Sequence, residues 1–145
     1  MLCSVLIQYV LKRDVRAKDG DSWSRRKSFD LDERAIQTVK KKADVRGYRN
    51  IEAHATSAAD LRFIKDGLVD FVLANGLLCS MSGDRESAVK EIRRILKPGG
   101  QAYLSLGFPP PLGHVNRAEW ESILDRFRVQ RRGDGLRVKW AMVSV

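Results

Sequence analysis

The chain has 145 residues, of which 43% are hydrophobic and 31% are charged, a composition typical of a water-soluble globular protein. Its length suits one domain with a substantial core and excludes two independent ones, and no apolar run approaches the roughly 20 residues that a membrane-spanning helix needs. With 27 basic and 18 acidic residues the formal net charge is +9, so the surface favours anionic partners.

Cysteine and histidine usage bounds the chemistry further. The two cysteines, Cys3 and Cys79, form no CxxC pair, which argues against a disulfide framework or a zinc site and favours a reducing, cytoplasmic location. The only histidines are His54 and His114, so we expect no histidine-based metal centre. The apolar opening, residues 1–11, lacks the basic start and the small-residue cleavage site of a signal peptide, and we interpret it as a structural element.

The first clear elements follow residue 28. Residues 28–30 end a short predicted strand, and Asp32 is positioned to cap a helix. Gly47 suits the left-handed position that ends such a helix. A second strand is predicted over Ile51 to Ala55, followed by a polar loop through Asp60. The apolar face of the predicted helix consists of Ala35, Ile36, Val39 and Ala43.

The middle of the chain continues the alternation of strand and helix. A strongly apolar strand is predicted from Val69 to Leu73, and a helix from Asp84 to Leu96, stopped by Pro98. Another strand follows over Gln101 to Leu106. Residues 107–113 contain three consecutive prolines, and we expect a loop over the carboxyl edge of the sheet, where a substrate would lie.

The last part of the chain predicts a helix and a hairpin. Asn116 and Glu119 have the spacing of a capping box. Residues 127–132 and 136–145 are predicted strands joined by a turn at 133–135. The buried side of the helix is predicted to consist of Trp120, Ile123, Leu124 and Phe127.

Two segments carry a family resemblance. Residues 69–81 and residues 91–105, the latter containing Lys-Pro-Gly-Gly, resemble the second half of a class I S-adenosylmethionine-dependent methyltransferase. The resemblance covers residues 28–145, and the terminal antiparallel hairpin separates such a sheet from that of a dinucleotide dehydrogenase. It implies one Rossmann-like α/β domain over residues 1–145, mostly parallel, with an atypical segment at 1–27.

The resemblance also implies a cofactor site for S-adenosylmethionine. Asp30 matches the family's acidic residue that accepts hydrogen bonds from the ribose hydroxyls, and Leu31 would pack on the adenine. The alternative for Asp30 is that it only helps to cap the following helix. Ser57 stands where the family usually has an acid that recognises the adenine, while the N–H of Ala58 is retained.

The fourth strand of the family lines the methyl-donor and substrate pockets. Asn75 and Gly76 match that segment, and the amide of Asn75 could position a nucleophile. No catalytic base can be named from the sequence. Cys79 is interpreted as a small buried apolar residue and not as a nucleophile.

The family's glycine-rich loop after the first strand is missing, since the first glycine of the chain is Gly20. In one register residues 5–9 form the first strand, and Tyr9, Leu11 and Arg13 replace the loop glycines. In the other register the strand and loop are deleted, and the segment is a helix. Its apolar stripe would then be Leu2, Val5, Leu6, Tyr9 and Val10.

Three readings of function stay open. The first is methyl transfer to an unidentified small molecule. The second is a catalytically silent methyltransferase-like subunit that binds a partner or RNA through basic clusters such as residues 25–27 and 40–42. The third is an enzyme that lacks its N-terminal portion. If the central strand is absent or distorted, we expect the strand edges near Phe29 and Val69 to be covered in a homodimer.

Overall fold

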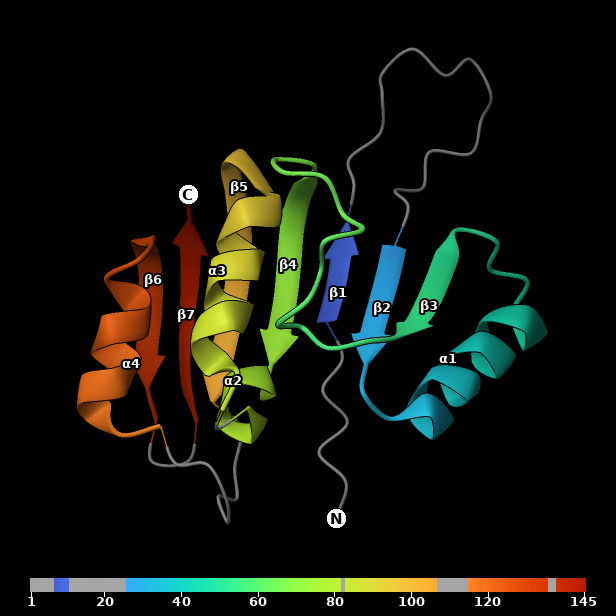
Figure 1. Ribbon diagram of the computed structural model, residues 1–145, viewed down its shortest axis with the longest axis horizontal. Coiled ribbons are helices and arrows are strands. Elements are labelled where there is room, and N and C mark those ends of the chain that lie inside the picture. The colour runs from blue at the N-terminus through green and yellow to red at the C-terminus, as the bar shows by residue number, and fades with distance from the viewer. Residues whose placement is uncertain (1–6, 11–25, 82, 107–114, 136–137) are drawn as a thin grey trace.

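The computed structural model describes residues 7–10, 26–81, 83–106, 115–135 and 138–145. They form one seven-stranded sheet in the order β3-β2-β1-β4-β5-β7-β6 (Figure 1). The strands are β1 (Ile7–Val10), β2 (Arg26–Asp30), β3 (Ile51–Ala55), β4 (Val69–Asn75), β5 (Leu96–Leu106), β6 (Arg128–Asp134) and β7 (Lys139–Ser144). The helices are α1 (Glu33–Val45), α2 (Leu77–Ser80), α3 (Arg85–Ile95) and α4 (Arg117–Leu124).

Strand direction defines a common carboxyl edge. The pairs β2·β3 and β4·β5 are parallel, and β1 is antiparallel to both β2 and β4. The terminal pair β6·β7 is an antiparallel hairpin attached to β5 through β7. Figure 1 shows β1 and β7 pointing upward while the other strands point downward. The carboxyl ends of β2, β3, β4 and β5 therefore meet at one edge of the sheet.

The structure of residues 7–10 differs from both registers that the sequence suggested. Ile7 to Val10 do form a strand, and it lies in the centre of the sheet, so the helical register is wrong for these residues. The strand register places them correctly but predicts a parallel strand, whereas β1 runs against its neighbours. Two parallel neighbouring strands need a crossover connection, usually a helix, whereas antiparallel neighbours do not. Because β1 is antiparallel to β2, no helix is needed between them. Leu11 and Arg13 lie outside the described residues.

The inner edges that motivated the predicted homodimer are occupied. Ile7 pairs with Phe29 on one side and with Ala74 on the other, so β1 supplies partners to both β2 and β4. The outer strands of the sheet are β3 and β6. A homodimer stays a prediction, but the unpaired inner edges proposed as its cause are absent from the described strands.

Several local signals formed as predicted. The Asp32 carboxylate accepts from the Arg34 N–H at 2.8 Å and caps α1, and Gly47 has φ +68° beyond the end of the helix. β3 spans residues 51–55 as predicted. Asn116 and Glu119 form the reciprocal capping box of α4. The buried side of α4 contains Trp120, Ile123 and Leu124, and Phe127 is buried just beyond the helix.

The boundaries of α3, β5 and β6 differ from those predicted from the sequence. The helix α3 ends at Ile95, and β5 begins at once, so Pro98 lies within β5 and does not end the helix directly. Residues 97–100 form a bulge between the partners of Val69 and Phe71, where a proline without an N–H is tolerated. The hairpin turn lies later than predicted, because Gly133 and Asp134 still belong to β6. The helix α2 was not predicted, and residues 107–113 lie outside the described residues.

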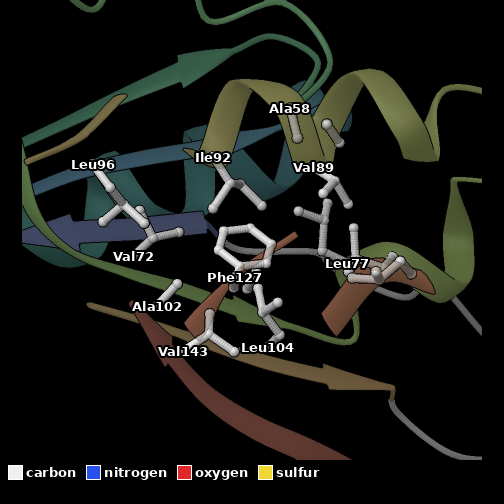
Figure 2. Close-up of a cluster of buried hydrophobic side chains, with 14 of the residues drawn as sticks. Ala58, Val72, Leu77, Val89, Ile92, Leu96, Ala102, Leu104, Phe127 and Val143 are labelled. Atoms are coloured by element: carbon white, nitrogen blue, oxygen red, sulfur yellow. The ribbon is translucent and has the colours of Figure 1, made fainter. Parts of the chain in front are cut away.

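The main core lies on one face of the sheet. Side chains from α3 and α4 pack there against alternate residues of the central strands, and Figure 2 shows part of this cluster. The whole cluster includes Val72, Ile92, Leu104 and Trp120, each no more than 1% exposed. Ile36 and Ala43 are also buried but stand apart from this cluster. The helix α1 therefore covers the opposite face of β2 and β3. None of the helices formed by the described residues is long and apolar enough to cross a bilayer.

One arginine ties the long loop after β3 to α3. The Arg94 guanidinium donates to the carbonyls of Leu61 and Ile64, both at 2.8 Å, and to the carboxylate of Glu91. It also pairs with Asp66. Glu91 in turn accepts from the Leu61 N–H at 2.7 Å. Because Leu61 and Ile64 are fully buried, this network fixes the loop that leads from β3 to β4.

Replacing Arg94 should destabilise the fold. We expect Arg94→Ala to lower the free energy of unfolding by about 2 kcal/mol, since carbonyl and carboxylate groups lose charge-assisted hydrogen bonds. Urea denaturation measures the change. Arg93→Ala is the matched control, because Arg93 is exposed and forms no ion pair with a described residue, and it should stay within about 0.5 kcal/mol of wild type.

The same network predicts a pH dependence. The Arg94 hydrogen bond lowers the pKa of Glu91 below its ordinary value of 4.5. A lowered carboxyl pKa contributes stability above the ordinary value and loses it as the pH falls through the lowered one. The penalty of Arg94→Ala should therefore be largest near neutral pH and shrink in acid. An equal penalty at pH 7 and pH 3 would contradict this account.

Candidate functional site

Two polar residues end the parallel strands β2 and β4, which flank β1, at the carboxyl edge. Asp30 is the last residue of β2 and Asn75 is the last residue of β4. Both follow residues that pair with Ile7 of β1, so they stand level with each other on either side of that strand. Two strand spacings separate their backbones by about 10 Å. Because side chains alternate along a strand, both point to the face opposite Phe29 and Ala74.

Only one of the two carboxyl oxygens of Asp30 accepts a hydrogen bond from a described residue. The residue is 7% exposed, its Oδ1 accepts from the Asp32 N–H at 2.8 Å, and its main-chain oxygen accepts from the Thr56 N–H at 3.0 Å. The Oδ2 atom is buried and has no hydrogen-bond partner among the described residues. Asp30 thus contributes to the entry of α1, as the capping alternative predicted, and it also retains a free acceptor.

The loop after β3 lies beside Asp30. The Thr56 N–H bond to Asp30 brings Ser57 and Ala58 next to the end of β2. The Ser57 Oγ accepts from the Ala59 N–H at 3.1 Å and shapes a tight turn, while Ala58 packs into the core. The nearby Asp60 is held by Arg62 at 2.7 Å, and the hydrogen bond from Arg62 lowers the pKa of Asp60.

Asn75 is positioned by a residue that sequence reasoning missed. The Ser105 hydroxyl donates to Asn75 Oδ1 at 2.6 Å, and Ser105 is the register partner of Asn75 on β5. This orientation leaves the amide NH₂ group of Asn75 free to donate. Ser105 could have been found from the sequence by aligning the ends of the two parallel strands.

Gly76 turns the chain from β4 into α2. Its φ of +68° is the left-handed conformation that favours glycine. Its N–H donates to both the carbonyl oxygen and the hydroxyl of Ser105, at 3.0 and 3.1 Å. The half-buried Cys79 thiol donates to the Gly76 carbonyl at 2.9 Å, a structural role that agrees with its interpretation as a packing residue.

Leu31 is the apolar member of the site. It directly follows Asp30 and is 73% exposed, although it is a large aliphatic side chain. The structure thus gathers Asp30, Leu31, Ser57 and Ala58 at the ends of β2 and β3, with Asn75 and Gly76 at the end of β4. We call these six residues the strand-end site. Within the described ranges no group of three or more His, Cys, Asp and Glu side chains is placed to hold a metal ion.

A separate groove of about 520 Å³ lies between α3 and α4. Arg85 pairs with Glu119 at 3.5 Å and Arg126 pairs with Glu86 at 3.2 Å, so two ion pairs link its walls. These helices pack on the core face of the sheet, whereas Asp30 and Asn75 point to the other face. The groove is therefore distinct from the strand-end site.

A family model described as a methyltransferase domain matches residues 17–104, which is more than half of the chain. The chain belongs to this methyltransferase-domain family. The matched range includes every residue of the strand-end site and begins after β1. No curated protein matched the chain.

Solved structures share the methyltransferase fold. The PH0226 protein from Pyrococcus horikoshii has a TM-score of 0.70 at 15% identity over 81% of this chain and 70% of its own. A SAM-dependent methyltransferase from Aquifex aeolicus has a TM-score of 0.67 at 20% identity, covering 81% and 66%. The [4+2]-cyclase SpnF has a TM-score of 0.66 at 21% identity, covering 74% and 44%. At these identities the likeness shows the fold, and this chain spans less than two thirds of the last two structures.

The comparisons support S-adenosylmethionine as the cofactor, and the site fits one end of it. The buried, unpartnered Oδ2 of Asp30 suits a hydroxyl donor such as the ribose diol. β1 runs away from the carboxyl edge, so its last described residue, Val10, does not lie beside Asp30 and Asn75. Among the described residues, Asp30 is therefore the one whose open acceptor suits a hydroxyl of the cofactor's nucleoside part.

The unpartnered Oδ2 of Asp30 should lower the free energy of unfolding of the ligand-free protein. We expect Asp30→Asn to raise the free energy of unfolding of the ligand-free protein by about 1 kcal/mol, because a neutral amide is less costly to bury without a partner than a charged carboxylate. The Asn Oδ1 can keep the bond to the Asp32 N–H. Urea denaturation measures the effect, with Asp32→Asn as control, since asparagine caps a helix as well as aspartate does. A loss of stability at position 30 would show that the carboxylate is a structural group.

Proposed function

We propose that the chain is an S-adenosylmethionine-dependent methyltransferase module that acts on a small-molecule acceptor and anchors the cofactor mainly by its nucleoside. The observation that carries this proposal is the buried Oδ2 of Asp30, a retained acceptor with no partner among the described residues. The family match supports methyl transfer as the general activity. A small-molecule acceptor is favoured because the exposed basic residues Lys40, Lys41, Lys42 and Arg46 lie toward the end of α1, away from Asp30 at its start.

Each side chain of the site has a distinct role in this proposal. Asp30 accepts from the ribose hydroxyls, Leu31 packs against the adenine ring, and the Ala58 N–H donates to it. Ser57 can still accept from the adenine amino group, although its Oγ already accepts from Ala59. A hydroxyl in place of a carboxylate loses a charge-assisted bond, which weakens binding by about 1.5 to 3 kcal/mol.

Asn75 belongs to the acceptor side of the proposed site. The bound cofactor supplies an electrophilic methyl group, so the chain's own residues need mainly to orient the acceptor. With its Oδ1 held by Ser105, the Asn75 amide NH₂ can hold an oxygen or nitrogen of the acceptor in one place. Gly76, which follows Asn75, has no side chain to compete with that acceptor.

The anchoring role of Asp30 is tested by titrating S-adenosylhomocysteine into the full chain by calorimetry. We expect Asp30→Asn to weaken binding at least tenfold, since the amide replaces an acceptor with a donor. Asp32→Asn makes the same chemical change two residues away and should leave the affinity within about twofold. Equal affinity in wild type and Asp30→Asn, or equal losses in both variants, would rule out this anchor.

A second candidate function rests on the basic end of α1. Lys40, Lys41, Lys42 and the nearby Arg46 are exposed and form no ion pair with a described residue, and Tyr48 beside them is 51% exposed. Cations next to an exposed aromatic ring are suited to RNA. A silent, RNA-binding subunit is therefore the alternative. This surface lies where α1 ends, at the sheet edge opposite the strand-end site.

RNA binding separates the two candidates. For a small-molecule enzyme we expect no submicromolar affinity for a generic single-stranded RNA by filter binding at about 150 mM salt. Affinity that falls steeply with salt would instead indicate phosphate contacts. Reversing the charges at Lys40, Lys41 and Lys42 should then abolish it, and reversing Lys65, an exposed lysine of the loop after β3, should not. That combined result would favour the binding subunit.

A further inference from the structure

We infer that one face of β7 and β6 carries a second binding site, which takes a mononucleotide, an aromatic base that bears a phosphate. The two strands are the second and third beyond β4 in the sheet, so this site lies apart from the strand-end site. It consists of the aromatic side chains of Tyr103 and Trp140 and of two arginines on the edge strand, Arg128 and Arg131.

The two faces of β7 differ in what covers them. Ala141 and Val143 belong to the core cluster under α3 and α4, so Trp140 and Met142 point to the opposite face. Among the described helices, α1 lies on that opposite side of the sheet. Figure 1 shows it beside β2 and β3, at the other end of the sheet from β6 and β7. We call the face of β7 and β6 that bears Trp140 the open face.

The indole of Trp140 lies against the neighbouring strand at Gly133. The two residues are register partners, and a methyl group on Gly133 would overlap the indole Nε1 and lie 2.7 Å from Cε2. Glycine therefore leaves the space that the ring occupies. Tyr103 of β5 stacks with Trp140, with 6.1 Å between the ring centroids and 18° between the planes. Both side chains are partly exposed, and a planar base can stack on such an aromatic pair.

Two arginines lie on the same face as the rings. Arg131 is the register partner of Met142, and Arg128 is the register partner of Ser144. Since register partners share a face of the sheet, both arginines stand on the open face. Both are exposed, and neither forms an ion pair with a described residue.

The third arginine of β6 shows how the two faces differ in charge. Arg132 is the register partner of Ala141 on the core face, and there it pairs with Glu121 of α4 at 2.8 Å. The open face has no such carboxylate among the described residues of β6 and β7. Its members in register are Arg128, Arg131, Gly133, Trp140, Met142 and Ser144. This face is therefore positively charged and suits an anion.

The spacing of the rings and the arginines suits a single nucleotide. Arg131 stands two residues before Gly133, about 7 Å along β6, a distance that an arginine side chain can span. A base stacked on Trp140 thus has its phosphate within reach of the Arg131 guanidinium, which can bind phosphate through two hydrogen bonds. Neither β6 nor β7 places another aromatic side chain on this face for the next base of a longer strand.

The test is an NMR titration of the ¹⁵N-labelled full chain with guanosine 5′-monophosphate, guanosine and inorganic phosphate. We expect the monophosphate to shift the indole N–H signal of Trp140, which Trp140→Leu removes and so assigns. Guanosine and phosphate should each bind at least about tenfold more weakly, because one lacks the charge and the other lacks the ring. Added salt should also weaken binding of the monophosphate.

Arg131→Gln should weaken binding of the monophosphate about tenfold, since a charge-assisted bond to phosphate is lost. Arg93→Gln makes the same change at an exposed arginine of α3 and should leave the affinity within about twofold. Both positions are exposed, so both variants should fold. Equal losses in the two variants would contradict a specific contact at Arg131.

Asp30→Asn separates this site from the strand-end site and should leave the shift of the Trp140 signal unchanged. The inference is overturned if the monophosphate binds without moving that signal, or if its binding is lost in Asp30→Asn. It is also overturned if guanosine binds as tightly as the monophosphate, or if single-stranded RNA moves the signal and the monophosphate does not. The proposed function is unaffected by these results, because it is tested with S-adenosylhomocysteine.

Discussion

The pairing of β1 with both β2 and β4 is the constraint on which the rest of the sheet depends. Ile7 to Val10 join the β3-β2 half to the β4-β5-β7-β6 half, and β1 supplies the strand pairing between them. Because β1 is antiparallel to both neighbours, β2 and β4 remain parallel to each other. The sheet therefore keeps one carboxyl edge for ligands, even though the chain reaches its central strand from the opposite direction.

The two halves of the sheet, on either side of β1, are also connected through the loop between β3 and β4. Its residues Leu61 and Ile64 are buried in the same cluster as α3 and β4, and Arg94 of α3 holds their carbonyls. The raised pKa of the Arg94 guanidinium reflects its hydrogen bond to Glu91. Since the loop starts at Ser57 and Ala58, anchoring it also fixes the wall of the strand-end site beside Asp30.

The strand-end site contains a buried acceptor without a partner, Asp30 Oδ2, which lowers the free energy of unfolding. Most buried polar atoms in folded proteins have a hydrogen-bond partner, so an unpartnered carboxylate oxygen needs a reason. At Asp30 the helix entry uses one oxygen and leaves the other free. Asn75 differs, because its oxygen already accepts from the Ser105 hydroxyl, while its NH₂ group can donate. The two strand ends thus present complementary chemistry, an acceptor on β2 and a donor on β4.

Local signals in the sequence determined most elements and the composition of the site. The Asp32 cap, the capping box from Asn116 to Glu119, and the 51–55 strand each depend on contacts between residues close in the chain, and they formed as predicted. The family resemblance placed Asp30 and Asn75 at the ends of strands and Ser57 in the loop after the 51–55 strand. Tertiary structure alone decided the direction of β1, the bulge at residues 97–100 and the bond from Ser105 to Asn75. These features depend on which strands become neighbours, and a four-residue apolar strand has the same side-chain periodicity in either direction.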